Sequence, residues 1–402
     1  MTVFDPFPLP GHQGLAPTHA INWEAIAQTV VRRILALQRA ERVIISADPY
    51  YGGAPLEAVR CEIQRAGALE LATILHWSPA VGGLRLPSGR HPDSELDRAE
   101  TAAMKQLFSC ADVFILLMND RRRAYRTVAT SQSDEVVNEW KGGRAAHLHW
   151  FQDPRFPDPS HPVNLLHDRV NEKAIIDLDY DWMRRMMERM AEMIRGRELR
   201  LTDDAGTDLR FRAGLRFHTN YGDASRERMA GFSSGRDREE EVPVGSFRFI
   251  PEPNSAHGRV VFPRRTDGEA MALGRGFDVH PFTGAGLAFE FRDGRAVSVQ
   301  TGGDQRALDQ AWIAETGDKD VLGEVIIGCN PLLTPVPGSS FLPHYGFGAG
   351  VVRLILGDNV LSGGQFRSTF HRWLTWSNAS LEVEGRPLID QGRQIPLEDL
   401  HL

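Results

Sequence analysis

The chain has 402 residues, a formal net charge of −7, and 25% charged residues of both signs distributed along its length. This charge balance argues against a nucleic-acid partner, because proteins that bind nucleic acid gather basic residues for phosphate contacts. The sequence offers no apolar run of about eighteen residues that would cross a bilayer, and its first residues do not resemble a secretory signal. We therefore expect a cytoplasmic protein with neither a nucleic-acid nor a membrane partner.

Cysteine usage limits the kinds of site that the chain can build. Cys61, Cys110 and Cys329 are widely spaced, which supports neither a disulfide framework nor a cysteine-rich zinc site. Any metal ion would then be bound by histidine and carboxylate side chains.

The first half of the sequence alternates helical and strand patterns. Helical spacing of apolar residues predicts helices over 22–40, 55–68, 95–111 and 179–196, and short apolar runs predict strands over 41–48, 69–77, 112–120 and 145–151. This alternation is typical of an α/β domain with a parallel sheet, which we place at residues 1–196 as a Rossmann-like unit. No Gly-x-Gly-x-x-Gly turn follows a strand and no Walker loop occurs, so nucleotide binding is not indicated.

After Gly196 the pattern changes to short strand-like runs separated by Gly, Asp and Pro. One predicted helix, at 304–316, interrupts them, and a hairpin is expected around Glu384 and Gly385. We therefore predict a β-rich α+β domain over 197–402. The five methionines at helical spacing in 183–193 are interpreted as core packing, because methionine fills irregular apolar gaps.

The candidate metal ligands lie in this second half. A facial pair of histidines with one carboxylate leaves coordination positions open for substrate, water or dioxygen, and Glu324, His344 and His371 can supply such a set. Each also has a structural alternative: His371 as a hydrogen-bonded core residue, and His344 as a surface residue of a glycine-rich turn. Glu324 follows a glycine at the start of an apolar strand, where a carboxylate is costly to bury unless it is paired or ligating.

Further side chains suggest acid–base chemistry or ring binding. His218 is a candidate general acid or base, and Tyr345 a candidate proton or hydrogen-bond donor. Trp373 and Trp376 either wall an aromatic pocket or pack in the core, and packing is favoured. His147 and His149 alternate on one predicted strand, so their side chains point the same way. This arrangement is compatible with a metal site, but we favour a structural role on a buried aromatic face.

The order of segments in the second half resembles two known families. The run GLAFEFRDGRAVSVQ, a helix, LGEVIIGCNP, a histidine-containing turn and STFHRW before SLEVEGRPLIDQGR look like the C-terminal domain of aminopeptidase T metallopeptidases. They are also similar to 2,5-dihydroxypyridine 5,6-dioxygenases, whose Gly-His-x-x-x-Gly-x-Asn-Pro segment matches residues 323–331. The resemblance implies a metal-dependent enzyme with this fold.

The departures from these families bear on the metal site. Three elements of the dinuclear peptidase site are replaced, at Ser246, at Gly350-Val351 and at Arg372-Trp373, which favours one metal ion over two. Against the dioxygenases, the family histidine falls on Glu324 and the final aspartate on Trp373. Our hypothesis is that the ligand types are exchanged, with His344 completing two histidines and one carboxylate.

The resemblance thus predicts a mononuclear Fe(II) enzyme that opens the ring of a small aromatic or heteroaromatic compound. The alternative is a Zn- or Mn-dependent aminopeptidase or amidase, and a third possibility is a binding protein that retains the fold. Because the relatives form homo-oligomers, we expect a homodimer or a higher homo-oligomer.

Overall fold

The computed structural model describes residues 21–47, 53–75, 95–119, 136, 139–140, 142–150, 152–153, 155–156, 158–233, 235–262, 286–339 and 341–399. The chain divides into two compact units. The first unit comprises Met1–Ile176 and Gly222–Pro243, and the second comprises Asp177–Tyr221 and Val244–Leu402. Each unit is described by itself.

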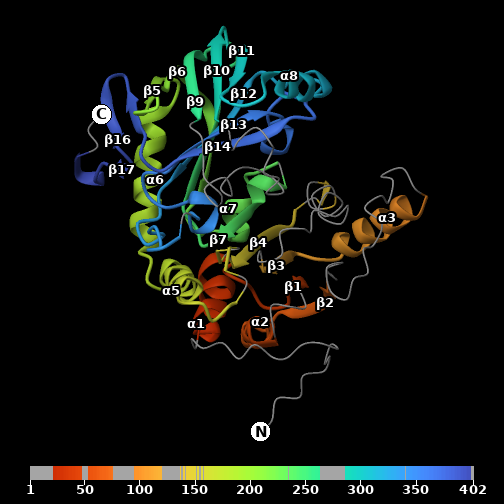
Figure 1. The fold of residues 1–402 in the computed structure, drawn as a ribbon. Helices are drawn as coiled ribbons and strands as arrows, with labels where there is room; N and C mark the ends of the chain where they lie inside the picture. Colours follow the sequence, from red (N-terminus) through yellow and green to blue (C-terminus); the bar gives the residue numbers. More distant parts are fainter. Residues whose placement is uncertain are drawn as a thin grey trace. The chain divides into compact units, whose positions relative to one another are not determined.

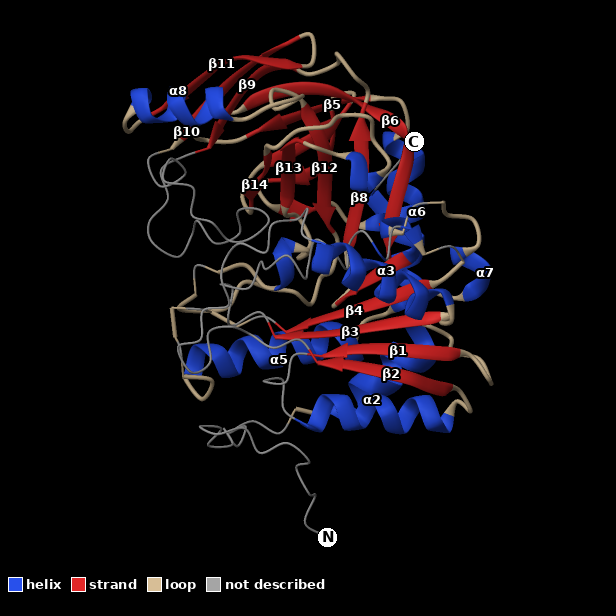
Figure 2. Cartoon of the chain, turned by 90° about the vertical axis from the view of Figure 1, so that its right-hand side faces the viewer, coloured by secondary structure: helices blue, strands red, loops and turns tan. Residues whose placement is uncertain are grey.

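The first unit is built on a parallel sheet of five strands in the order β2-β1-β3-β4-β7. Figure 2 shows β2, β1, β3 and β4 side by side in one layer. The strands are β1 (Arg42–Ala47), β2 (Leu69–Leu75), β3 (Val113–Asn119), β4 (Arg144–Trp150) and β7 (Glu239–Val242). The expected parallel α/β architecture is confirmed, and β7 adds a strand that the sequence did not suggest.

Helices connect these strands. They are α1 (Trp23–Gln28), which continues as a π-helical turn at Thr29–Ile34, α2 (Gly53–Arg65), α3 (Glu95–Ser109), α5 (Pro162–Ile176) and the short α7 (Arg226–Met229). Phe108 of α3 packs with Ile44, Phe114, Ala145 and Trp140 in one apolar cluster. Ile44, Phe114 and Ala145 lie opposite one another on three adjacent strands, so α3 covers that face of the sheet.

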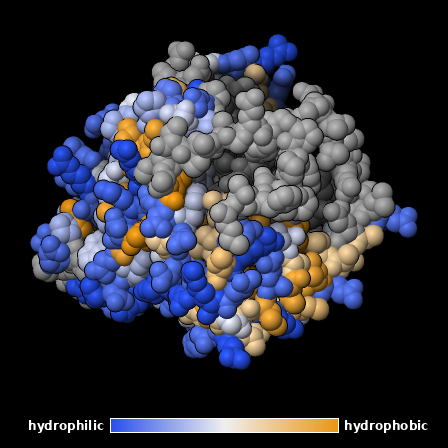
Figure 3. Space-filling model, turned by 90° about the horizontal axis from the view of Figure 1, so that it is seen from below, coloured by the Kyte–Doolittle hydropathy of each residue, from blue (hydrophilic) through white to orange (hydrophobic). Residues whose placement is uncertain are grey.

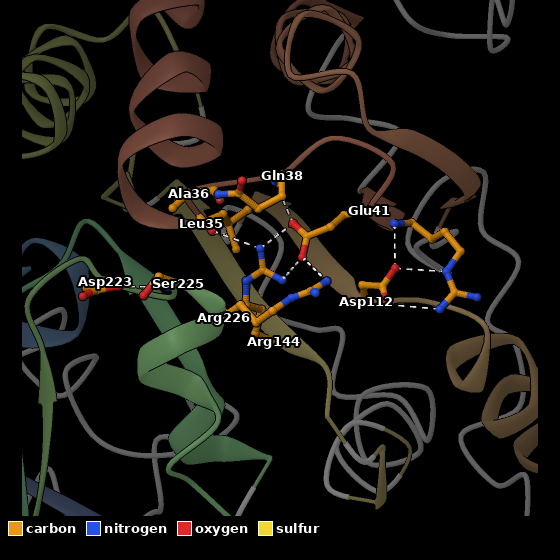
Figure 4. A network of polar contacts seen from close by, with 10 residues as sticks. Leu35, Ala36, Gln38, Glu41, Asp112, Arg144, Asp223, Ser225 and Arg226 are labelled. Atoms are coloured by element: carbon orange, nitrogen blue, oxygen red, sulfur yellow. Dashed lines mark hydrogen bonds and ion pairs between the residues drawn. The ribbon is translucent and has the colours of Figure 1, made fainter.

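A buried ion pair lies at the amino-terminal ends of β1 and β4 in this unit (Figure 4). Arg144, at the start of β4, donates to both carboxylate oxygens of Glu41 at 2.8 and 2.7 Å, and both side chains are 3% exposed. Arg226 adds a second guanidinium at 2.7 Å. Burial alone raises the pKa of Glu41, but the hydrogen bonds from Arg144 and from the backbone of Gln38 bring that pKa below its ordinary value. The segment 222–243 is thereby tied to the N-terminal part of the unit by charge as well as by β7.

The second unit is dominated by antiparallel strands. Its main path runs β14-β13-β12-β8-β6-β5-β15-β16-β17, with β9, β10 and β11 attached to it through β6 (Figure 1). The strands are β5 (Glu198–Thr202), β6 (Asp208–Asn220), β8 (Ser246–Pro251), β9 (His257–Phe262), β10 (Leu287–Arg292), β11 (Arg295–Thr301), β12 (Leu322–Gly328), β13 (Val352–Gly357), β14 (His371–Trp376), β15 (Ser380–Val383), β16 (Arg386–Asp390) and β17 (Arg393–Gln394). The helices are α6 (Tyr180–Ile194) and α8 (Gln305–Ala314).

Helix α6 begins at a capping residue and presents its methionines to the core. The Asp179 side chain accepts a hydrogen bond from the Trp182 backbone N–H at 2.8 Å. All five predicted core methionines are buried: Met183, Met186, Met187, Met190 and Met193. The interpretation of this stripe as core packing is confirmed.

The boundary between the units differs from the expected one at residue 196. The division falls after Ile176, so α6 belongs to the second unit, and residues 222–243 return to the first. Residues 222–243 return because β7 pairs with β4 in the parallel sheet. Its sequence, EEEV, is too acidic to suggest a strand.

No described helix is long and apolar enough to span a membrane. Seen from below, the described surface is largely hydrophilic with separate hydrophobic patches (Figure 3). Leu69 and Leu71 on the edge strand β2 are among the exposed apolar side chains.

Candidate functional site

One face of the second unit's sheet collects most of the candidate residues. Paired residues on adjacent strands point to the same side of a sheet. His218 lies opposite Arg248, Arg248 opposite Ile326, Ile326 opposite Arg353, and Arg353 opposite Thr375. Alternate positions of β6, β8, β12, β13 and β14 therefore form what we call the polar face: His218, Asn220, Ser246, Arg248, Glu324, Arg353, His371, Trp373 and Thr375.

The opposite face of the same strands is apolar. It comprises Phe247, Phe249, Val325, Ile327, Val352, Leu354, Leu374 and Trp376. The polar face is nevertheless also buried over much of its area, including Glu324, Arg248 and Arg353. Burying such groups costs free energy unless they are paired or hydrogen-bonded, so this concentration is typical of a functional site.

Glu324 accepts a hydrogen bond from a hydroxyl group. The side chain is fully buried, and Ser362 Oγ donates a hydrogen bond to Glu324 Oε1. Arg248 Nη1 in turn donates to Ser362 Oγ at 3.1 Å. A guanidinium, a hydroxyl and a carboxylate thus form a chain across β8, the turn at 360–362 and β12.

Arg353 is surrounded by aromatic rings. Its guanidinium carbon lies 4.2 Å from the Trp373 ring centroid and 5.5 Å from that of Phe347, and the residue is 2% exposed. The Tyr345 ring packs edge-on against Trp373 at 5.7 Å. Cation–π contacts of this kind hold a guanidinium plane in a fixed orientation.

Both ring nitrogens of His371 are engaged. Nδ1 lies 2.9 Å from the backbone oxygen of Asp358, and Nε2 accepts a hydrogen bond from the indole N–H of Trp373 at 2.9 Å. A carbonyl only accepts and an indole N–H only donates, so the ring is neutral with its hydrogen on Nδ1.

His344 is not the surface histidine that a glycine-rich turn allows. It is fully buried, in edge-to-face contact with Phe347 at 4.9 Å and with Tyr345 at 5.4 Å. Both His344 and Tyr345 have left-handed backbones, with φ of 39° and 54°. Two successive non-glycine residues in this region store strain, which is more common at functional sites.

The expected metal-ligand set is not assembled. Within the parts of the chain that the structure describes, no three His, Cys, Asp or Glu side chains form a group that could hold a metal ion. In this arrangement Glu324 accepts a hydrogen bond from Ser362, and His371 accepts one from Trp373. As placed, these side chains do not fit the Fe(II) site or its Zn or Mn alternative, and the ligand assignment to Glu324, His344 and His371 stays a prediction.

The Gly-x-Asn-Pro ending matched in the sequence has a structural role here. Asn330 is buried, its amide N–H donates to the backbone oxygen of Val244 at 2.7 Å, and its Oδ1 accepts from the Leu332 backbone at 2.9 Å. Asn330 thus fastens the loop after β12 to the start of β8.

The two tryptophans of β14 lie on opposite faces. Trp376 is buried in the apolar core, where its indole N–H donates to Asp203 at 2.6 Å, so packing is correct for this residue. Trp373 belongs to the polar face.

In the first unit, the rings of His147 and His149 lie 6.1 Å apart, and burial together with His149 lowers the pKa of His147 to about 3.

Arg248 and Arg353 are two candidate site residues that the sequence pattern did not single out. A signal for them exists, because each is the single charged residue of an otherwise apolar strand, SFRFIP and VRLILG. Arginine is almost never fully buried unless it is paired, so its presence in such a strand indicates a buried charge with a role.

Comparisons with known proteins find the same fold in solved structures. Neither protein-family models nor curated proteins match the chain. A structure of 2,5-dihydroxypyridine dioxygenase from Pseudomonas putida KT2440 matches with a TM-score of 0.61 at 14% identity, over 94% of this chain and 98% of that one. Wild-type AmpT from Thermus thermophilus matches with a TM-score of 0.59 at 16% identity, over 93% and 99%. The predicted resemblance is thus confirmed, and the chain has the fold that these two proteins share.

Proposed function

We propose that the chain is an enzyme that acts on a small aromatic compound carrying an acidic group, bound on the polar face. The observation that supports this most directly is the buried Arg353 guanidinium, which contacts the rings of Trp373 and Phe347. Similarity of fold to a dioxygenase that acts on a hydroxylated pyridine is consistent with an aromatic substrate.

Charge and shape on the polar face suit such a compound. Its buried ionisable side chains include the guanidinium groups of Arg248 and Arg353, the carboxyl group of Glu324 and the imidazole of His218. A guanidinium binds a carboxylate through two parallel hydrogen bonds, which fixes both the position and the orientation of a planar acid. Trp373 and Tyr345 add ring surfaces against which an aromatic compound can stack.

The reactions implied by the resemblance were Fe(II)-dependent ring opening and, alternatively, metal-dependent hydrolysis. Both require a set of metal ligands that Glu324, His344 and His371 do not form, so we assign no step to a metal. We propose instead that His218 and Tyr345 exchange protons with the bound compound, since imidazole titrates near neutral pH and a phenol can donate. His218 lies opposite Arg248 on the polar face, and Tyr345 lies against Trp373.

A binding protein that retains the fold is the second candidate. The hydrogen bonds of Glu324 and His371 favour it, because they engage two polar groups that could otherwise bind or react with a ligand. Turnover distinguishes the two candidates: incubation with a panel of hydroxylated pyridines and benzoates, followed by mass spectrometry, yields a product only from an enzyme.

Substrate class is tested by binding. Arg353→Met is expected to weaken an aromatic carboxylate by roughly tenfold to a hundredfold, since a hydrogen bond to a charged group contributes about 1.5 to 3 kcal/mol. The matched control is Arg372→Met, on the neighbouring strand and the other face, which should leave affinity unchanged. Equal binding of a benzoate and of its amide by the wild-type protein would refute the proposed substrate class.

A further inference from the structure

His371 is fixed by two hydrogen bonds that define its tautomer. The Asp358 carbonyl accepts from Nδ1–H, and the remaining lone pair, on Nε2, accepts from the Trp373 indole. A neutral imidazole has a single lone pair in the ring plane, and a metal ion would need this one. Metal binding at His371 therefore requires Trp373 to leave.

Trp373 is itself held by its neighbours. Arg353 covers its ring at 4.2 Å, and the edge of Tyr345 packs against it at 5.7 Å. Moving the indole breaks the bond to His371, the cation–π contact and the ring packing together. All three contacts would be lost together, so they oppose metal entry at His371.

The carboxylate end of the face is also occupied. Glu324 accepts from Ser362, which accepts from Arg248. Two buried guanidinium groups share this face with Glu324, and like charges repel strongly in a medium of low dielectric constant. A dication is therefore disfavoured where an organic anion is favoured.

From these contacts we infer that the polar face binds its ligand without a resident metal ion, and that His371 is a positioning residue for the Trp373 indole. The hydrogen bond sets the orientation of the indole, and the indole in turn presents its face to the guanidinium of Arg353. The identity of the ligand rests on the proposed function, whereas the occupied state of His371 does not.

The first experiment measures metal binding to the full chain. Anaerobic calorimetric titration with Fe(II), Zn(II) and Mn(II), together with elemental analysis, is expected to give no stoichiometric binding to the polar face. Benzoate affinity is expected to be the same with and without a chelator. One metal ion per chain that is lost in His371→Ala would overturn the inference, while chelator-resistant benzoate binding would still stand as support for the proposed substrate class.

The second experiment tests the positioning role directly. In a protein labelled with ¹⁵N-tryptophan, the Trp373 indole N–H should exchange slowly with solvent, and His371→Ala should speed its exchange at least tenfold. Trp376, bonded to Asp203 on the other face, is the internal control and should be unaffected. His371→Gln places an amide oxygen near the former Nε2 and should restore slow exchange. Unchanged indole exchange in His371→Ala would refute the positioning role.

Discussion

The buried ion pair between Glu41 and Arg144 leads to a specific prediction about stability. Glu41→Gln keeps the shape of the side chain but leaves the buried guanidinium of Arg144 without its carboxylate. Breaking a buried pair in this way costs about 3 to 5 kcal/mol, because an uncompensated charge remains in the interior. The contribution of Arg226 to this cost is small, since its side chain is 60% exposed and exposed pairs contribute roughly 0 to 1 kcal/mol.

Native-state hydrogen exchange can measure this loss of stability separately for amides of the first unit and of the second unit. The opening free energy of the β1 and β4 amides should fall by about 3 to 5 kcal/mol in Glu41→Gln, while the β12 amides in the second unit should be unaffected. Arg226→Met should cost about 1 kcal/mol or less. Replacing both partners, as Glu41→Leu with Arg144→Met, should cost much less than Glu41→Gln alone. A loss below about 1 kcal/mol in Glu41→Gln would refute the reasoning.

Two further predictions concern pH and backbone geometry. The pKa of His147 is lowered to about 3 from 6.5, so the stability that its neutral form contributes is complete above pH 6.5 and is lost as the pH falls toward 3. Between pH 7 and pH 5 the wild-type protein should therefore lose about 2 kcal/mol more stability than His147→Asn in urea unfolding. Parallel losses would mean that Glu239, 3.5 Å away, offsets the effect of burial. Gly357 has φ of 89°, and an added Cβ would lie 2.0 Å from the Phe370 oxygen. Gly357→Ala should thus cost at least about 1 kcal/mol more than Gly385→Ala, whose φ is similar but whose surroundings are open. Equal costs in thermal unfolding would contradict the crowding at Gly357.

The sequence predicted those parts of the fold that local patterns determine. Alternating apolar runs and helical spacing were sufficient for β1 to β4, α6 and α8. The strand β7 was missed because a run of glutamates has no strand signature, and it forms through pairing with a distant part of the chain. The domain boundary was displaced for the same reason.

The candidate site was predictable to the level of side-chain direction. Strand periodicity, combined with the pairing of the strands, places Glu324, His371 and His218 on one face of the sheet. Which atoms then meet is set by distances across strands and by the bulge between Leu322 and Glu324, which no spacing reveals. His344 was read as a plausible surface residue because a glycine-rich turn is usually exposed, whereas the structure buries it on a strained backbone.

The central claim is that the polar face binds an aromatic anion through Arg353. The most direct test compares the dissociation constants of benzoate and benzamide for the wild-type protein and for Arg353→Met, all in the presence of a chelator. The wild-type protein is expected to prefer benzoate by at least roughly tenfold, and Arg353→Met is expected to lose this preference. Equal preference in the two proteins, or binding of benzoate that appears only when a metal ion is added, would contradict it.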